Sequence, residues 1–208
     1  MYVPEHFREV DLDQIASLMA SAPLGCLVAN GSEGLVANHL PLLADKDGVL
    51  IGHVALANDM HRLIGDGQEV LVIFRGVDGY ISPNSYPSKQ IHHQHVPTWN
   101  YQVAHVEGVI SFQHDERSKR AAVGLLTRHQ EKQLNGDNAW RMADAPADYM
   151  TDMLGKIVAF KIAVTRIIAK SKLSQNRDEQ DFQGAVDSLR ATGREQLADL
   201  MEARRGRS

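Results

Sequence analysis

The sequence has one cysteine, no long apolar run and no excess of basic residues. Cys26 cannot form an internal disulfide, and the apolar run around it, LGCLVA, favours a buried structural thiol over a nucleophile. No stretch approaches the length of a membrane span or a signal-peptide core, so we expect a cytoplasmic protein. The G-x-G-x-x-G, P-loop and G-x-S-x-G patterns are also missing, so neither a Rossmann nucleotide site nor a serine hydrolase has support.

The net charge of −4 limits binding to nucleic acid. Sequence-independent DNA binding depends on Lys and Arg that neutralise phosphates. One locally basic stretch, ARRGRS at 203–208, could supply them, and its alternative is a solvated C-terminus. DNA is therefore a partner with little support in the sequence.

Hydrophobic and polar residues alternate along the chain in the manner of an α+β protein. The predicted strands cover residues 24–30, 35–45, 49–56, 70–74, 99–114 and 157–168. The predicted helices cover residues 11–21, 58–65, 115–133, 149–154, 179–190 and 192–204. We expect the first three strands to form an antiparallel meander. We also expect a turn at residues 76–79 and an interruption of the strand 99–114 near Gly108.

Antiparallel strands with helices at both ends predict an α+β barrel rather than a parallel sheet. The chain has no internal repeat, low-complexity tract or interdomain linker. We therefore expect one domain over residues 1–208, with C-terminal helices from about residue 179.

A long aromatic loop follows the strand at 70–74. Pro83, Pro87 and Pro97 exclude a regular helix and a central strand here, and the aromatic content argues against disorder. Two interpretations remain open: a recognition loop that offers flat faces and polar anchors, or a surface loop pinned by its own aromatic residues.

The order of residues in several blocks resembles one known family. The blocks are MYVPEHF, NHLPLL, GHVALAN, FRGVDGYISPNSYPSK, VPTWNY, HVEG and KLSQNR, and they span nearly the whole chain. Together they resemble the PaiB-type family of FMN-binding negative transcriptional regulators. The resemblance implies an antiparallel split β-barrel of the FMN-binding type with flanking helices, and a homodimer with flavin at the subunit interface. Leu56 stands where the family often has a basic residue, and Ser85 where it often has Trp.

A bound FMN would need cations and donors for its phosphate. Arg62 and Lys89 are the candidate cations, and Asn58 and Ser88 are the candidate neutral donors. The alternative for both cations is ordinary solvated charge.

The family resemblance favours a role in cofactor binding for His39 and His53, and two residues of VPTWNY are further candidates. His39 and His53 lie near the ends of predicted strands, and a hydrogen-bonded structural histidine is the alternative. Trp99 could cover the flavin ring and Asn100 could meet its edge, or both could belong to the core. Four further residues either close the cofactor site or cap the next helix: Lys172, Ser174, Gln175 and Asn176.

His92, His93 and His95 form a loose cluster between two prolines. Imidazole clusters can bind zinc or nickel, but no carboxylate or cysteine completes a spaced ligand set here. We therefore expect no metal site.

The sequence leaves three functions to compare. The first is an FMN-binding regulator that uses flavin occupancy or redox state as its signal. The second is a small FMN-dependent oxidoreductase that exchanges hydride or electrons with NAD(P)H or a small molecule, although no catalytic motif identifies its residues. The third is a cofactor-free interaction module on the same barrel.

Overall fold

The structure is a computed structural model that describes residues 1–45 and 47–206. Its contacts divide the chain into two compact units. Unit 1 contains Met1–Ser21, Arg75–Ala104 and the chain from Ile168 onward. Unit 2 contains Ala22–Phe74 and His105–Ile167. The assignment of one domain to residues 1–208 stays a prediction.

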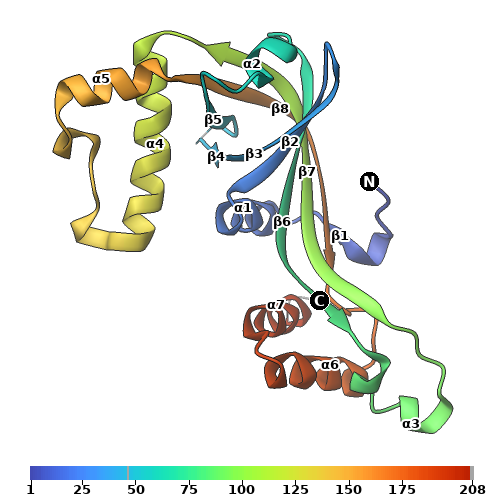
Figure 1. The fold of residues 1–208 in the computed structure, drawn as a ribbon. Coiled ribbons are helices and arrows are strands. Elements are labelled where there is room, and N and C mark those ends of the chain that lie inside the picture. The colour runs from blue at the N-terminus through green and yellow to red at the C-terminus, as the bar shows by residue number, and fades with distance from the viewer. Residues whose placement is uncertain (46, 207–208) are drawn as a thin grey trace. The chain divides into compact units, whose positions relative to one another are not determined.

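The strands belong to one sheet with the order β3-β2-β6-β7-β8-β5-β4, and β1 pairs with β8 (Figure 1). They are β1 (Arg8–Glu9), β2 (Leu24–Gly31), β3 (Gly34–Pro41), β4 (Leu43–Ala44), β5 (Leu50–Ala55), β6 (Glu69–Ile81), β7 (Thr98–Gln113) and β8 (Ile157–Lys172). Every pairing with a defined register is antiparallel. Among the described residues no pairing joins β3 to β4, so the sheet is open. The predicted α+β fold with an antiparallel sheet is confirmed.

The predicted three-stranded meander is confirmed in its pairings, although its second strand is divided into β3 and β4. β2 pairs with β3, and β4 pairs with β5 in the register Leu43↔Ile51. β5 also pairs with β8, in the register Gly52↔Phe160. A Cβ at Gly52 would lie 2.7 Å from Leu42 Cδ2 and would overlap the Phe160 ring. The glycine therefore makes room for that aromatic side chain, which alternation along β5 could not reveal.

The helices of unit 2 are α2 (Met60–Leu63), α4 (Glu116–Asn135) and α5 (Ala147–Gly155). Asp115 caps α4, because its Oδ1 accepts a hydrogen bond of 2.9 Å from the Ser118 backbone N–H. Ala122 of α4 packs into a small buried cluster with Ile51 and Ala159. One apolar face of α4 therefore covers β5 and β8.

The helices of unit 1 are α1 (Leu12–Ser21), α3 (Lys89–His92), α6 (Glu179–Ala191) and α7 (Glu195–Arg205). The last two lie side by side and bury an apolar core with the end of β6 (Figure 1). This core contains Ile81, Tyr86, Leu173, Phe182, Ala185, Val186, Leu189, Leu197, Ala198 and Met201. No helix in the described part of the chain combines the length and the apolar character that a membrane crossing requires.

Two predictions based on glycine are wrong. β6 continues through Gly76 and Gly79, where a turn was expected, and β7 is not interrupted at Gly108. A Cβ at Gly76 would lie 2.7 Å from Leu18 Cδ1, and one at Gly79 would lie 2.7 Å from Leu197 Cδ2. These glycines allow close packing against a strand and do not reverse the chain.

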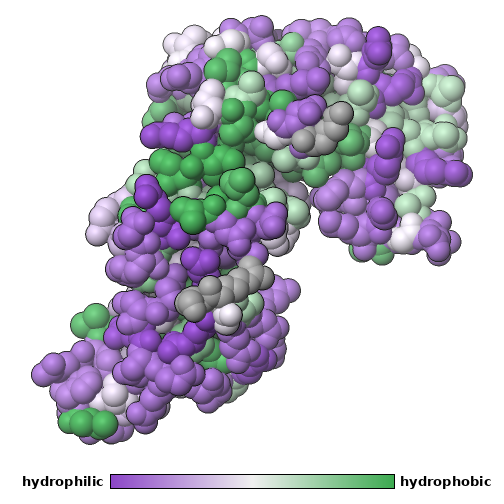
Figure 2. All heavy atoms as spheres, turned by 180° about the vertical axis from the view of Figure 1, so that it is seen from behind, coloured by the Kyte–Doolittle hydropathy of each residue, from purple (hydrophilic) through white to green (hydrophobic). Residues whose placement is uncertain are grey.

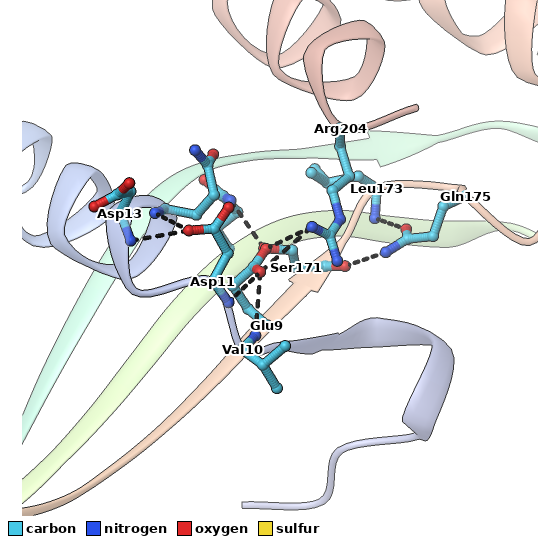
Figure 3. A network of polar contacts seen from close by, with 10 residues as sticks. Glu9, Val10, Asp11, Asp13, Ser171, Leu173, Gln175 and Arg204 are labelled. Atoms are coloured by element: carbon cyan, nitrogen blue, oxygen red, sulfur yellow. Dashed lines mark hydrogen bonds and ion pairs between the residues drawn. The ribbon is translucent and has the colours of Figure 1, made fainter. Parts of the chain in front are cut away.

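A buried carboxylate holds the N-terminal segment of unit 1 to the end of β8 (Figure 3). Glu9 is 5% exposed, and its Oε1 accepts from the backbone N–H groups of Val10 and Asp11 at 3.1 and 3.2 Å. Its Oε2 accepts from Ser171 Oγ at 3.1 Å and forms an ion pair with Arg204 Nη1 at 3.2 Å. One side chain therefore joins β1, the start of α1, β8 and α7.

We expect Glu9→Gln to lower the free energy of unfolding by about 1–3 kcal/mol, because the charge-assisted bonds weaken in a buried place. Asp199→Asn is the control, since Asp199 pairs with Arg190 where both side chains are exposed. The control should change stability by less than about 0.5 kcal/mol. Chemical denaturation of both variants measures the difference, and equal losses would contradict the role given to Glu9.

Candidate functional site

The predicted site residues divide between the two units. His39, His53, Asn58 and Arg62 belong to unit 2. The others belong to unit 1: Ser88, Lys89, Trp99, Asn100, Lys172, Ser174, Gln175 and Asn176. The two groups are described separately below.

The unit 2 group is built from β3, β5 and α2, and β3 contacts both of the others. Asn58 follows β5, and its Oδ1 accepts from the Met60 backbone N–H at 2.9 Å, at the start of α2. Its Nδ2 donates to Asn38 Oδ1 of β3 at 2.8 Å. Asn58 therefore fixes the start of α2 against β3. Asn38 was not identified from the sequence, although it precedes His39 in the NHLPLL block.

His53 is the member of this group with an unsatisfied polar atom. It lies in β5, opposite Ala159 of β8. Its Nδ1 is buried and has no hydrogen-bond partner among the described residues. Burial lowers the pKa of the imidazole below its usual value, so the ring is neutral at physiological pH. A buried polar atom without a partner is costly, which makes a ligand a good explanation for it.

Arg62 and His39 lie at more open positions. The Arg62 guanidinium pairs with Asp59 at 2.6 Å, and both side chains are exposed. His39 lies on the exposed side of β3, opposite Cys26 of β2. Leu56, at the family's frequently basic position, is 44% exposed, and its carbonyl oxygen lies 3.0 Å from Nε2 of His61.

The unit 1 group satisfies most of its polar atoms internally. Asn100 is fully buried, and its Nδ2 donates to Ser174 Oγ at 2.9 Å. Trp99 donates from Nε1 to Asp78 Oδ1 at 2.7 Å. Lys172 donates to the carbonyl oxygen of Trp99 at 2.9 Å, and burial is the main cause that lowers the pKa of its ammonium. These residues hold β7 to β6 and to the end of β8.

The KLSQN segment forms its own turn. Gln175 donates from Nε2 to the Ser171 carbonyl at 2.6 Å and accepts at Oε1 from the Leu173 N–H at 2.7 Å (Figure 3). Asn176 is exposed. Asp178, which is none of the four predicted residues, caps α6 by accepting from the Asp181 N–H at 2.8 Å.

The aromatic loop is pinned to α6 through Asp181. Ser88 donates from its backbone N–H and from Oγ to this carboxylate, at 3.1 and 2.7 Å. His95 Nε2 lies 2.7 Å from the same hydroxyl, and Lys89 bonds to Asn84. Burial alone would raise the pKa of the Asp181 carboxyl, but the hydrogen bonds from Ser88 lower it. The described residues contain no group of three or more potential ligands that could hold a metal ion.

Of the two groups, the one in unit 2 fits a flavin. The ring carbonyls, ring N–H and ribityl hydroxyls of FMN can pair with a buried neutral imidazole nitrogen, such as Nδ1 of His53. An exposed guanidinium such as that of Arg62 can pair with its phosphate. Bound FMN would supply hydride or electron transfer.

Comparisons with known proteins identify the family of the chain. Residues 1–166 match the family described as "Putative FMN-binding domain". The chain is 32% identical over 209 residues to "Protease synthase and sporulation protein PAI 2" of Bacillus subtilis, covering 97% of each chain. It is 25% identical to an uncharacterized protein of Emericella nidulans, covering 93% of this chain and 92% of that one.

Solved structures show the same fold at low identity. The FAD and heme binding protein from Mycobacterium smegmatis has a TM-score of 0.59 at 15% identity, covering 86% of this chain and 79% of that one. The flavocytochrome Anf3 from Azotobacter vinelandii has a TM-score of 0.55 at 12% identity, covering 88% and 78%. The predicted split-barrel fold class is confirmed, with the sheet left open. The chain belongs to the PaiB-type family of FMN-binding proteins.

Proposed function

We propose that FMN binds to the unit 2 group and that the chain is a negative transcriptional regulator whose signal is the flavin. The buried, unpaired Nδ1 of His53 carries the proposal for the site. Neutral His53 forms a hydrogen bond to the flavin. Asn58 is held beside β3 by its bond to Asn38, within the same group of elements.

Arg62 is the phosphate ligand in this proposal. Its present partner, Asp59, forms an exposed ion pair at the surface. Such pairs contribute at most about 1 kcal/mol, so exchange for a phosphate costs little. The unit 1 candidates act as structural residues, since Asn100, Ser88 and Lys172 already bond within their own unit.

We propose that the protein is a homodimer that buries an apolar face of unit 2. Cys26 of β2 lies opposite His39 of β3 on one side and opposite Ile73 of β6 on the other. The three side chains therefore share one face of these strands. Leu35 and Leu24 lie on the same face and are 81% and 59% exposed. Figure 2 shows hydrophobic side chains open to solvent over the strands of unit 2. A second copy on this face would bring His39 to the subunit interface.

The regulatory function is supported by family membership and by the word "sporulation" in the name of the Bacillus subtilis relative, "Protease synthase and sporulation protein PAI 2". Two arginines of the basic C-terminal stretch are already in ion pairs, which argues against DNA binding there. Arg204 pairs with Glu9, and Arg205 pairs with Glu179 at 2.7 Å. Residues 207–208 lie outside the described part of the chain.

We expect His53→Phe to weaken FMN binding about tenfold, because one hydrogen bond to the flavin is lost. His105→Phe is the control, since burial also lowers the pKa of that histidine in the same unit. Flavin absorbance after titration and removal of free FMN gives both dissociation constants. Unchanged binding by the His53 variant would exclude His53 from the site.

We expect Leu35→Glu to convert the dimer to a monomer, since the new carboxylate would be buried in an apolar interface. Leu134→Glu is the matched control, because Leu134 is also 81% exposed but lies on α4. Light scattering after size exclusion measures the mass. If both variants keep the same mass as the parent protein, the proposed interface is wrong.

The regulator and the oxidoreductase are separated on the same FMN-loaded sample. We expect the protein to bind a promoter fragment, with an affinity that differs between the FMN-loaded and the FMN-free protein. This affinity should fall as the salt concentration rises. We also expect no catalytic turnover with NAD(P)H and an added electron acceptor. Turnover without any promoter binding would replace the regulatory proposal by the enzymatic one.

A further inference from the structure

A second candidate binding site lies in unit 2, and its lining residues differ from those proposed for FMN. It is a cleft of about 840 Å³ between α4, from Gly124 onward, and the segment that follows this helix. The α4 wall consists of Gly124, Thr127, Arg128 and Lys132, and residues 136–142 form the other wall. The volume is within the range of roughly 300–1,000 Å³ that small-molecule sites occupy.

Residues at helical spacing along α4 form the first wall. Gly124, Arg128 and Lys132 are four residues apart, so they share one face of the helix. The glycine leaves the cleft open at its position, and a Cβ there would lie 3.4 Å from Met142 Sδ on the other wall. The two walls therefore come within contact distance at this end.

The chain itself holds the second wall in place. The Glu131 carboxylate accepts from Asn135 Nδ2 at 2.7 Å and from the Trp140 backbone N–H at 2.9 Å. These bonds, that from Asn135 most of all, lower the pKa of Glu131, so this carboxylate stays charged and bonded. The Arg141 backbone N–H donates to Asp144 Oδ2 at 2.8 Å, and the two side chains form an ion pair of 3.2 Å. The cleft is thus defined without any partner molecule.

The cleft is positively charged and two of its cations are free. Arg128 and Lys132 make no side-chain hydrogen bond or ion pair with any residue that the structure describes. Arg141 is already paired with Asp144, and Asp137 is the one carboxylate that lines the cleft. Two unpaired cations one helical turn apart are well suited to a phosphate or diphosphate group.

The lining also contains an aromatic surface and neutral polar groups. Trp140 lines the cleft and is 41% exposed, so part of its ring is open to a ligand. An indole of this kind can stack on a flat heterocycle. Thr127, Asn138 and Asp137 offer hydrogen-bonding groups to hydroxyls or to a base edge.

We propose that this cleft binds a nucleoside phosphate. The base stacks on Trp140, and the phosphates pair with Arg128 and Lys132. The sugar hydroxyls face the neutral groups and the carboxylate of Asp137. Its lining shares no residue with the FMN group.

Titration of ADP into the FMN-loaded protein at low salt, followed by tryptophan fluorescence, tests the proposal. We expect saturable quenching that Trp140→Phe abolishes. The double variant Arg128→Ala, Lys132→Ala should bind ADP at least about tenfold more weakly, because two charge-assisted contacts are lost. Its FMN content should equal that of the parent protein.

The control is Arg117→Ala, Lys119→Ala, which removes the same charge from the same helix outside the cleft. It should bind ADP as the parent protein does. Three results would overturn the proposal. They are an equal loss of ADP affinity in both double variants, no quenching up to about 10 mM ADP, and quenching that survives Trp140→Phe. Equal affinity for inorganic pyrophosphate would overturn the stacking of a base. Loss of FMN from the Arg128, Lys132 variant would assign the cleft to the flavin instead.

Discussion

Strand β8 is the element on which both units depend. In unit 2 it pairs with β5 from Ile157 to Ile162, and in unit 1 it pairs with β1 at Ala169 and Lys170. Its β-branched residues favour an extended strand, which is buried near both ends and partly exposed in its middle. At its end, Ser171 donates to the buried carboxylate of Glu9. One strand therefore pairs with segments from both units, and it leads directly into the polar segment at 172–176.

The two groups of polar residues differ in how completely the protein satisfies them. In unit 1, Asn100 bonds to Ser174, and Ser88 bonds to Asp181 through both its backbone and its hydroxyl. In unit 2, the buried Nδ1 of His53 has no partner among the described residues. Native proteins rarely leave buried polar atoms unpaired. Two buried side-chain atoms among the described residues have no partner, Nδ1 of His53 in unit 2 and the hydroxyl of Tyr86 in unit 1. Of the two, His53 is a candidate site residue, which is our reason for placing FMN in unit 2.

Much of the fold could be predicted from local patterns, whereas the pairing of distant strands could not. The helix at 11–21 and the strand at 157–168 follow directly from periodicity. The pairing of β5 with β8 depends on the fit of Phe160 over Gly52, which links residues far apart in the sequence. Gly76 and Gly108 were mistaken for chain breaks because a glycine needed for packing and one needed for a turn look alike in a sequence.

The site was predicted in part. The candidates His39, His53 and Asn58 share a unit, whereas the candidates Asn100 and Ser88 bond internally. Residue type cannot separate these cases, because it does not show which polar atoms already have partners. Asn38 and the cleft beside Trp140 were missed for the same reason: both depend on contacts made only in the folded chain.

An experimental structure of the protein with FMN bound tests the central claim most directly. Our account predicts the flavin against β3, β5 and α2, with one of its polar atoms within hydrogen-bond distance of Nδ1 of His53. A flavin bound elsewhere, with this nitrogen still buried and without a partner, would contradict the account.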